Sequence, residues 1–278
     1  PIARVLDSSR CVIRVYFSPR DSRGRSQVRR LDFDVNSPRE TLTVSDHPLL
    51  EPGKLGAFDD AGVTLGSIVD DGSRRLVYYT GWNLTHNVPF NNSIGVAEMG
   101  ENDAFRRLGD GPIMTRTLNE PYSCASPFVL KEGNSFRMWY ASMDSWQETT
   151  FGPRHRYNIK IAESDDGISW NRSGRVAIDY EGEDEYAFGR PFVAHENGIY
   201  KMWYSFRGSG YRIGYAESPD GWSWIRKDSI VGINVSDEGW DSEMVEYPFL
   251  FDCEDVKFML YNGNGYGKSG FGLAKLVQ

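Results

Sequence analysis

Glu246 is an acidic residue that interrupts a pattern repeated elsewhere in the chain. It begins the segment Glu246-Tyr-Pro248-Phe-Leu, whereas the aligned positions of three other copies hold Leu65, Ala125 and Gly189. A carboxyl group can donate a proton while it is protonated, and can act as a base or nucleophile while it is ionised. An active site is made once in a repeated structure, so a residue that departs from the repeat is a candidate catalytic group. Glu246 is therefore the first such candidate.

Arg190 departs from the repeat at the neighbouring position. The aligned positions hold Gly66, Ser126 and Tyr247. Burying an unpaired guanidinium is prohibitively costly, so we expect Arg190 to face an open channel and to bind an anion or a carboxylate. Other arginines could extend this into a cationic patch that suits a uronic acid or a sugar nucleotide. They are Arg14, Arg20 and Arg207. A set of structural pairs with nearby acids is the open alternative.

A column of acids precedes the aligned segments by a few residues. Its members are Asp60, Glu120, Asp184 and Asp241. Asp60 is the second catalytic candidate, because Asp59 beside it could raise its pKa and the following Ala-Gly lets a ligand come close. The alternative for Asp60 is a turn that fixes the entry of a strand. We expect Glu120 and Asp184 to contact a substrate.

Polar and aromatic residues in the loops form a further set of candidates. The substrate-binding candidates among them are Asn83, His86, Glu243, Asn264 and Tyr266, and the loop at 143–156 adds Asp144, Trp146 and His155. Such mixtures stack on sugar faces and hydrogen-bond hydroxyls, although each residue could equally be an exposed loop side chain. His86 and His155 have no partner at metal-ligand spacing, so we expect no metal and no cofactor.

The elements that position these residues are short aromatic strands that recur five times. The clearest copies are 136–142 with 159–170, and 200–206 with 213–224. Both are bounded by Gly, Asn and Asp, as strands are, and no stretch sustains a helical period. Asp-Gly pairs at 166–167 and 220–221 predict tight turns into a fourth strand. The repeated Ala-Glu-Ser at 162–164 and 216–218 belongs to the packing of the repeat rather than to catalysis.

Inner strands are expected at about 1–6, 60–69, 120–129, 184–193 and 241–250. This spacing predicts an all-β, five-bladed β-propeller with three or four antiparallel strands per blade and an axial substrate funnel. We expect one domain over 1–278, with blades at about 1–53, 54–115, 116–179, 180–236 and 237–278. The last blade should end near Val277. It either stays short or is completed by a larger chain or an upstream segment.

Composition excludes several classes of protein. A net charge of -8 and a pI near 5.1 are a poor footprint for nucleic acid. No apolar run approaches the length of a membrane helix, so we expect no membrane partner and, by default, a cytoplasmic protein. Secretion stays open, because a leader could have been removed and four glycosylation sequons are present. We expect free buried thiols at Cys11, Cys124 and Cys253.

The pattern x-x-Pro-Phe, Gly/Asn, Tyr-x-Met-Trp-Tyr and a small-residue strand resembles the five-bladed glycoside hydrolases of the arabinanase, invertase and levansucrase superfamily. In that superfamily two Asp-Pro sites supply a base or nucleophile and a transition-state stabiliser, and a Glu two residues before a Pro is the general acid. Glu246-Tyr-Pro248 is similar to the acid motif. Where the family has Asp before Pro, this chain has Ser126-Pro127 and Arg190-Pro191.

The resemblance leaves two hypotheses. The first is a glycoside hydrolase or transglycosylase that acts on a glycan or sugar conjugate, with Glu246 as acid and Asp60 or another column residue as base. The second is a non-catalytic propeller module that binds a glycan or sugar nucleotide within a polysaccharide-processing protein. A carboxylate pair about 5–10 Å apart at the axis would favour the first.

Overall fold

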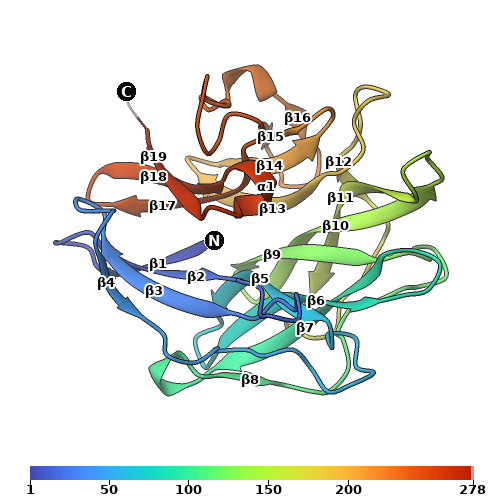
Figure 1. The fold of residues 1–278 in the computed structure, drawn as a ribbon, viewed down its shortest axis with the longest axis horizontal. Helices are drawn as coiled ribbons and strands as arrows, with labels where there is room; N and C mark the ends of the chain where they lie inside the picture. The colour runs from blue at the N-terminus through green and yellow to red at the C-terminus, as the bar shows by residue number, and fades with distance from the viewer. Residues whose placement is uncertain (277–278) are drawn as a thin grey trace.

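The chain folds into five small antiparallel sheets around a common axis. The computed structural model describes residues 1–276. Figure 1 shows the sheets arranged around the centre of the molecule, where the N-terminus lies. This confirms the predicted all-β, five-bladed propeller. The predicted end of the last blade near Val277 lies outside the described residues.

Each sheet is built from consecutive strands that pair side by side, from the inner strand at the axis to the outer one. The first holds β1 (Ile2–Asp7), β2 (Val12–Phe17), β3 (Arg29–Asp34) and β4 (Thr41–Val44), and the second β5 (Gly62–Asp70), β6 (Arg75–Leu84), β7 (Phe90–Met99) and β8 (Phe105–Arg107). The third holds β9 (Cys124–Glu132), β10 (Ser135–Gln147), β11 (Arg154–Ser164) and β12 (Val176–Ile178). The fourth holds β13 (Gly189–Glu196), β14 (Ile199–Arg207), β15 (Tyr211–Ser218) and β16 (Ile225–Arg226), and the fifth β17 (Glu246–Cys253), β18 (Val256–Asn262) and β19 (Phe271–Lys275).

Helical structure in the described residues is confined to single turns. These are α1 (Asn264–Gly267), η1 (Glu101–Asp103) and η2 (Asp228–Ile230). None of these helices is long and apolar enough to span a bilayer.

The aromatic strands pack between neighbouring blades, which explains why their residues are apolar on both faces. In β10, Met138, Trp139 and Tyr140 are each fully buried. Met138 and Tyr140 join a core shared with the second blade, whereas Trp139 joins one shared with the fourth. Large aromatic side chains bury the most apolar area per residue, so this repeated strand supplies much of the contact that holds blades together.

The predicted turns between third and fourth strands are present. Gly167 and Gly221 both have φ 73°, the left-handed region that glycine adopts without strain. Ser164 Oγ accepts from the backbone N of Gly167 at 2.9 Å, and Ser218 Oγ accepts from Gly221 at 2.8 Å. The repeated Ala-Glu-Ser thus serves the turn of its own blade, as the repeat predicted.

Each of the last four inner strands carries a β-bulge where it reaches the axis. The bulged residues Ser126, Arg190 and Tyr247 have φ of 52°, 51° and 59°, which is uncommon for residues other than glycine. A proline follows each of them. Proline has no N–H to donate, and it is tolerated at a bulge because the hydrogen-bond ladder is interrupted there. In the second blade the equivalent residue is Gly66, where a Cβ atom would lie 2.4 Å from the carbonyl oxygen of Pro127.

The inner strands leave almost no space at the axis. The cavity between them holds about one water-sized sphere and is lined by Pro1, Gly66, Ser126, Arg190 and Tyr247 with their neighbours. A sugar ring does not fit there. The expected axial funnel can therefore admit a ligand only at its mouth.

A disulfide joins the first blade to the last. Cys11, after β1, is bonded to Cys253 at the end of β17, with 5.6 Å between the Cα atoms and 242 residues between them in sequence. The prediction of three free thiols was wrong for this pair, because residues so distant in the chain meet only when the ring closes. Cys124 is the buried free thiol.

Candidate functional site

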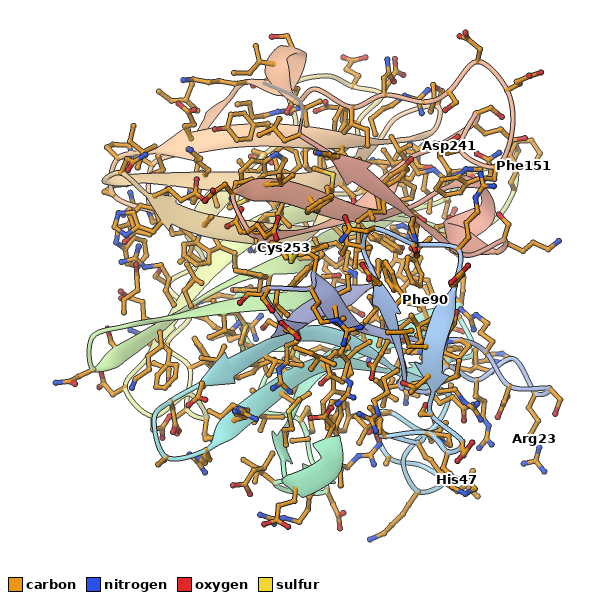
Figure 2. The ribbon with its side chains drawn as sticks, turned by 90° about the vertical axis from the view of Figure 1, so that its left-hand side faces the viewer. Arg23, His47, Phe90, Phe151, Asp241 and Cys253 are labelled. Carbon is orange, nitrogen blue, oxygen red and sulfur yellow. A yellow bond between two sulfur atoms is a disulfide. The ribbon has the colours of Figure 1, made fainter. Side chains whose placement is uncertain are left out.

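Most of the predicted site residues lie at one end of the ring. Neighbouring strands within each sheet are antiparallel, so the starts of the inner strands and the connections between second and third strands share an end. We call this end the loop face; it carries the connections 18–28, 85–89, 148–153, 208–210 and 263–270 and the segments before β5, β9, β13 and β17. In Figure 2 the labelled Arg23, Phe90, Phe151 and Asp241 lie toward it, on the right, while Cys253 lies farther to the left.

Glu246 is closed off from solvent at the start of β17. Its exposed fraction is 0%, and neither carboxyl oxygen has a hydrogen-bond partner among the described residues. Burial raises the pKa of Glu246 to about 8, although the positive charges of Arg190 and Arg207 act in the opposite direction. The group is therefore protonated at neutral pH.

Arg190 faces the axial cavity, as the sequence indicated, and reaches across it. Its Nη1 donates to the carbonyl oxygen of Leu65 in the second blade, and its guanidinium lies 5.1 Å from the ring centroid of Tyr247. The partners that the structure shows are thus a carbonyl oxygen and a tyrosine face. Binding of a ligand anion by Arg190 stays a prediction.

Asp60 belongs to the turn that leads into β5. Its Oδ2 accepts from the backbone N of Gly56 at 2.9 Å, which is the turn role given above as its alternative. The neighbouring Asp59 is the buried carboxylate, with an exposed fraction of 1%, and it accepts from Arg107 Nη2 at 2.7 Å. No contact joins Asp60 to Glu246 in the described residues, so a catalytic pair of these two stays a prediction without geometric support.

Glu120 is held in a buried network. It accepts from Tyr140 Oη at 3.1 Å and from Ser142 Oγ at 2.8 Å, and it is paired with Arg172. Burial alone would raise the pKa of Glu120, but the hydrogen bond and charge of Arg172 hold it below its usual value. All of its acceptor capacity is directed into the protein.

Two members of the acid column, Glu120 and Asp241, and Asp59 beside Asp60 each bond a tyrosine of their own blade. A tyrosine of the second strand donates to an acid in several blades: Tyr79 to Asp59 at 3.4 Å, Tyr140 to Glu120 at 3.1 Å, and Tyr261 to Asp241 at 2.9 Å. In the fourth blade Tyr204 donates instead to Asp228, and Asp184 is exposed. These pairs satisfy buried tyrosine hydroxyls, which a propeller of aromatic strands has in every blade.

Arg14 is not part of a cationic patch at the axial mouth. It pairs with Asp32 at 2.7 Å and with Asp103, which also accepts from Tyr16 Oη at 3.0 Å. These contacts tie the first blade to the second. The expectation for Arg14 was wrong, because acids of its own and the next blade already satisfy its charge.

The remaining loop candidates lie at the loop face in varied settings. Arg20 is exposed and lies 5.0 Å from the ring centroid of Trp82, His86 is exposed, and Asn83 has a buried Oδ1 atom without a partner. Asn264 holds two loops together, since its Oδ1 accepts from the backbone N of Glu243 at 2.8 Å. Contact of these residues with a substrate stays a prediction.

Arg207 lies in a tyrosine-lined cluster that sequence reasoning only partly foresaw. Its guanidinium is 5.6 Å from the ring centroid of Tyr186, 5.2 Å from that of Tyr211 and 6.0 Å from that of Tyr266, and its Nη1 donates to Tyr266 Oη at 2.6 Å. Arg154 stacks on the same Tyr186 ring at 4.7 Å. Arg154, Tyr186 and Tyr211 were missed: Arg154 comes from the third blade, and Tyr186 and Tyr211 come from two separate segments of the fourth.

An aromatic group continues this cluster toward the third blade. His155 lies 4.8 Å from Tyr157, 5.9 Å from Trp146 and 5.7 Å from Phe90, measured between ring centroids. Burial, together with the charges of Arg207 and Arg154, lowers the pKa of His155 to about 4, so the imidazole is neutral. A signal for this group was available in the Trp146 and His155 already singled out in one loop.

No three His, Cys, Asp or Glu side chains come together as metal ligands within residues 1–276.

Comparison with known proteins places the chain among propellers. It is 43% identical over 265 residues to a Mycobacterium tuberculosis H37Rv protein described as uncharacterized protein Rv1502, covering 95% of this chain and 88% of that one. Its structure is similar to a thermostable family-43 glycoside hydrolase (TM-score 0.72, 14% identity, 100% and 89% coverage). It is also similar to an endo-arabinase from Bacteroides thetaiotaomicron (TM-score 0.67, 14% identity, 100% and 93% coverage). No protein-family model matches the chain.

Proposed function

The chain belongs to the same family as Rv1502 of Mycobacterium tuberculosis, and from this family's propeller we propose that the protein binds a carbohydrate at the loop face. The observation that carries the proposal is the tyrosine-lined cluster beside Glu246. There Tyr186, Tyr211 and Tyr266 surround the guanidinium of Arg207, which has no carboxylate partner within the part of the chain that the structure describes. Aromatic faces and planar donors are the groups with which proteins hold sugar rings and hydroxyls.

An apolar floor supports these side chains. Ala141, Met143 and Tyr157 of the third blade are buried against Ala187 and Tyr211 of the fourth. Phe90, Trp146 and Tyr186 pack on this cluster from the loop side, each only partly buried. A rigid floor with partly exposed aromatic rings gives a ligand a preformed surface, which reduces the entropy lost on binding.

Binding without cleavage is favoured because Glu246 stands alone. Cleavage of a glycosidic bond normally requires a protonated carboxyl and an ionised one on either side of it. Asp59, Glu120 and Asp241 are each directed to a tyrosine of their own blade. The position that carries an Asp in the resembling hydrolases carries Arg190, which supplies neither a base nor a nucleophile.

A glycoside hydrolase is the second candidate, and one observation favours it. Glu246 occupies the position that resembles the family's acid, and its pKa of about 8 keeps it protonated at neutral pH, as a general acid must be. The base would then come from a residue that reaches the site only after a ligand has displaced Tyr266 or its neighbours.

The experiment that separates the two uses wild type and Glu246→Gln with a glycan array and a panel of aryl glycosides. Glu254→Gln is the matched control, since this exposed residue lies at the opposite end of the same blade. Binding without turnover supports the binding module. Turnover that Glu246→Gln abolishes and Glu254→Gln retains supports the hydrolase, and absence of both binding and turnover contradicts the proposal.

A further inference from the structure

Arg154 and Arg207 at the loop face have no carboxylate partner among the described residues, unlike several other arginines of this chain. Arg107, Arg172 and Arg226 each bond an acid at 2.8 Å or less. Arg154 instead bonds the Oε1 atom of Gln147 at 2.9 Å, and Arg207 bonds the hydroxyl of Tyr266. Within residues 1–276 no ion pair satisfies either of them, and the Nε atom of Arg207 is buried without any partner.

The guanidinium groups of Arg154 and Arg207 lie at the same tyrosine ring. Both guanidinium groups lie within 6 Å of the Tyr186 ring, and both act on the neighbouring His155. Glu246 is an acid that interacts with Arg207 and Tyr211 of the cluster, and its burial keeps it neutral at pH 7. Two full positive charges thus stand together in a protein whose net charge is -8.

The repeat does not account for this arrangement. Other arginines of the chain pair with acids, as Arg172 does with Glu120 and Arg226 with Glu185. Stacking on tyrosine leaves the edge of a guanidinium free, and that edge is the part that binds carboxylate or phosphate oxygens in a bidentate manner. Arg207 is partly buried and its Nε atom has no partner in the described residues, so its charge is costly there unless a ligand compensates it.

We propose that Arg154 and Arg207 bind the carboxylate or phosphate group of an acidic sugar, with Tyr186 and Trp146 contacting its ring. This inference rests on the proposed carbohydrate binding and names the class of ligand. A uronic acid and a sugar phosphate share the required chemistry, and the experiment distinguishes them.

The test is calorimetric titration of the whole chain with D-glucuronate, D-glucose 6-phosphate, D-glucose and inorganic phosphate. Wild type, Arg207→Gln and Arg154→Gln are compared with Arg75→Gln. Arg75 is an exposed arginine at the opposite end of the second blade, so its variant makes the same change of charge away from the site. Arg154 is itself exposed, so its variant tests the site without disturbing the core.

We expect one of the charged sugars to bind at least tenfold more tightly than glucose. Both site variants should lose at least tenfold of that preference, Arg75→Gln should retain it, and added salt should weaken binding of the charged sugar. Equal affinity for glucose and the charged sugars would overturn the inference while carbohydrate binding stands. Arginine-dependent binding of phosphate alone would keep the anion site and overturn the proposed function, and binding of none would overturn both.

Discussion

Arg190 of the fourth blade donates a hydrogen bond across the ring to the carbonyl oxygen of Leu65 in the second blade. The two residues are 125 positions apart in sequence. Each lies at the β-bulge of its inner strand. The arginine therefore fills the space that a substrate would need in order to enter the channel. An arginine has the reach and the several donors that such a bond across the axis needs.

Substitution Arg190→Ala should lower the free energy of unfolding by about 1–3 kcal/mol, because the carbonyl oxygen of Leu65 loses a charged donor. Urea denaturation at pH 7 measures the change, and Arg23→Ala, an exposed loop substitution, should change the free energy of unfolding by less than about 0.5 kcal/mol. A stability of Arg190→Ala equal to that of wild type would show that the bond across the axis contributes nothing.

Replacing Asp59 or the adjacent Asp60 by asparagine should change the free energy of unfolding by very different amounts. Asp59→Asn leaves Arg107 without its buried partner, so we expect about 3 kcal/mol of destabilisation. Asp60→Asn keeps an oxygen that can accept from Gly56, so the change should stay within about 0.5 kcal/mol. Thermal and urea unfolding of the two variants measure both effects. The same Asp60→Asn variant should bind carbohydrate normally, and loss of binding would restore Asp60 as a site residue.

Closure of the ring by Cys11 and Cys253 should be visible on reduction. The bond constrains 242 residues of the unfolded chain, and loss of such a bond typically costs about 2–5 kcal/mol. We expect dithiothreitol to lower the unfolding midpoint of wild type and to leave a Cys11→Ser/Cys253→Ser variant unchanged. Cys124 takes no part in the bond, so Cys124→Ala should keep the response to dithiothreitol.

The fold could be predicted because its information is local and repeated. Each blade can be recognised from a short stretch of sequence, such as the Asp-Gly turns at Gly167 and Gly221 or the aromatic strand around Trp139. Five similar repeats are compatible with only a few fold architectures. The prolines after Ser126 and Arg190 were visible in the alignment, but the bulges that they accompany were not predicted.

The contacts between blades could not be predicted in this way. Arg14 of the first blade pairs with Asp103 of the second, 89 residues away, and the partner of Cys11 lies near the other end of the chain. Such pairs depend on which blades become neighbours and on the angle between them, and a single sequence does not encode either in its spacing. The contact of Arg154 with Tyr186 of the next blade escaped notice for the same reason, whereas Glu246 was found because it breaks the repeat within one blade.

The raised pKa of Glu246 predicts that the protein loses stability as the pH rises. The folded state keeps this carboxyl protonated up to a pH of about 8, whereas the unfolded chain releases the proton near pH 4.5. Between these values the folded state binds more protons, so the free energy of unfolding falls with pH by up to about 1.4 kcal/mol per pH unit from this group alone. Its stabilising effect is fully present below pH 4.5 and is lost as the pH rises through about 8.

Urea denaturation of wild type and Glu246→Gln at pH 5, 7 and 9 measures this effect. The glutamine cannot ionise, so the variant should lose less stability than wild type between pH 5 and pH 9, and the difference isolates Glu246 from other titrating groups. Parallel pH profiles would mean that the carboxyl ionises normally. A general acid at this position would then lack the proton it has to donate at neutral pH, and the second candidate function would fail together with the prediction.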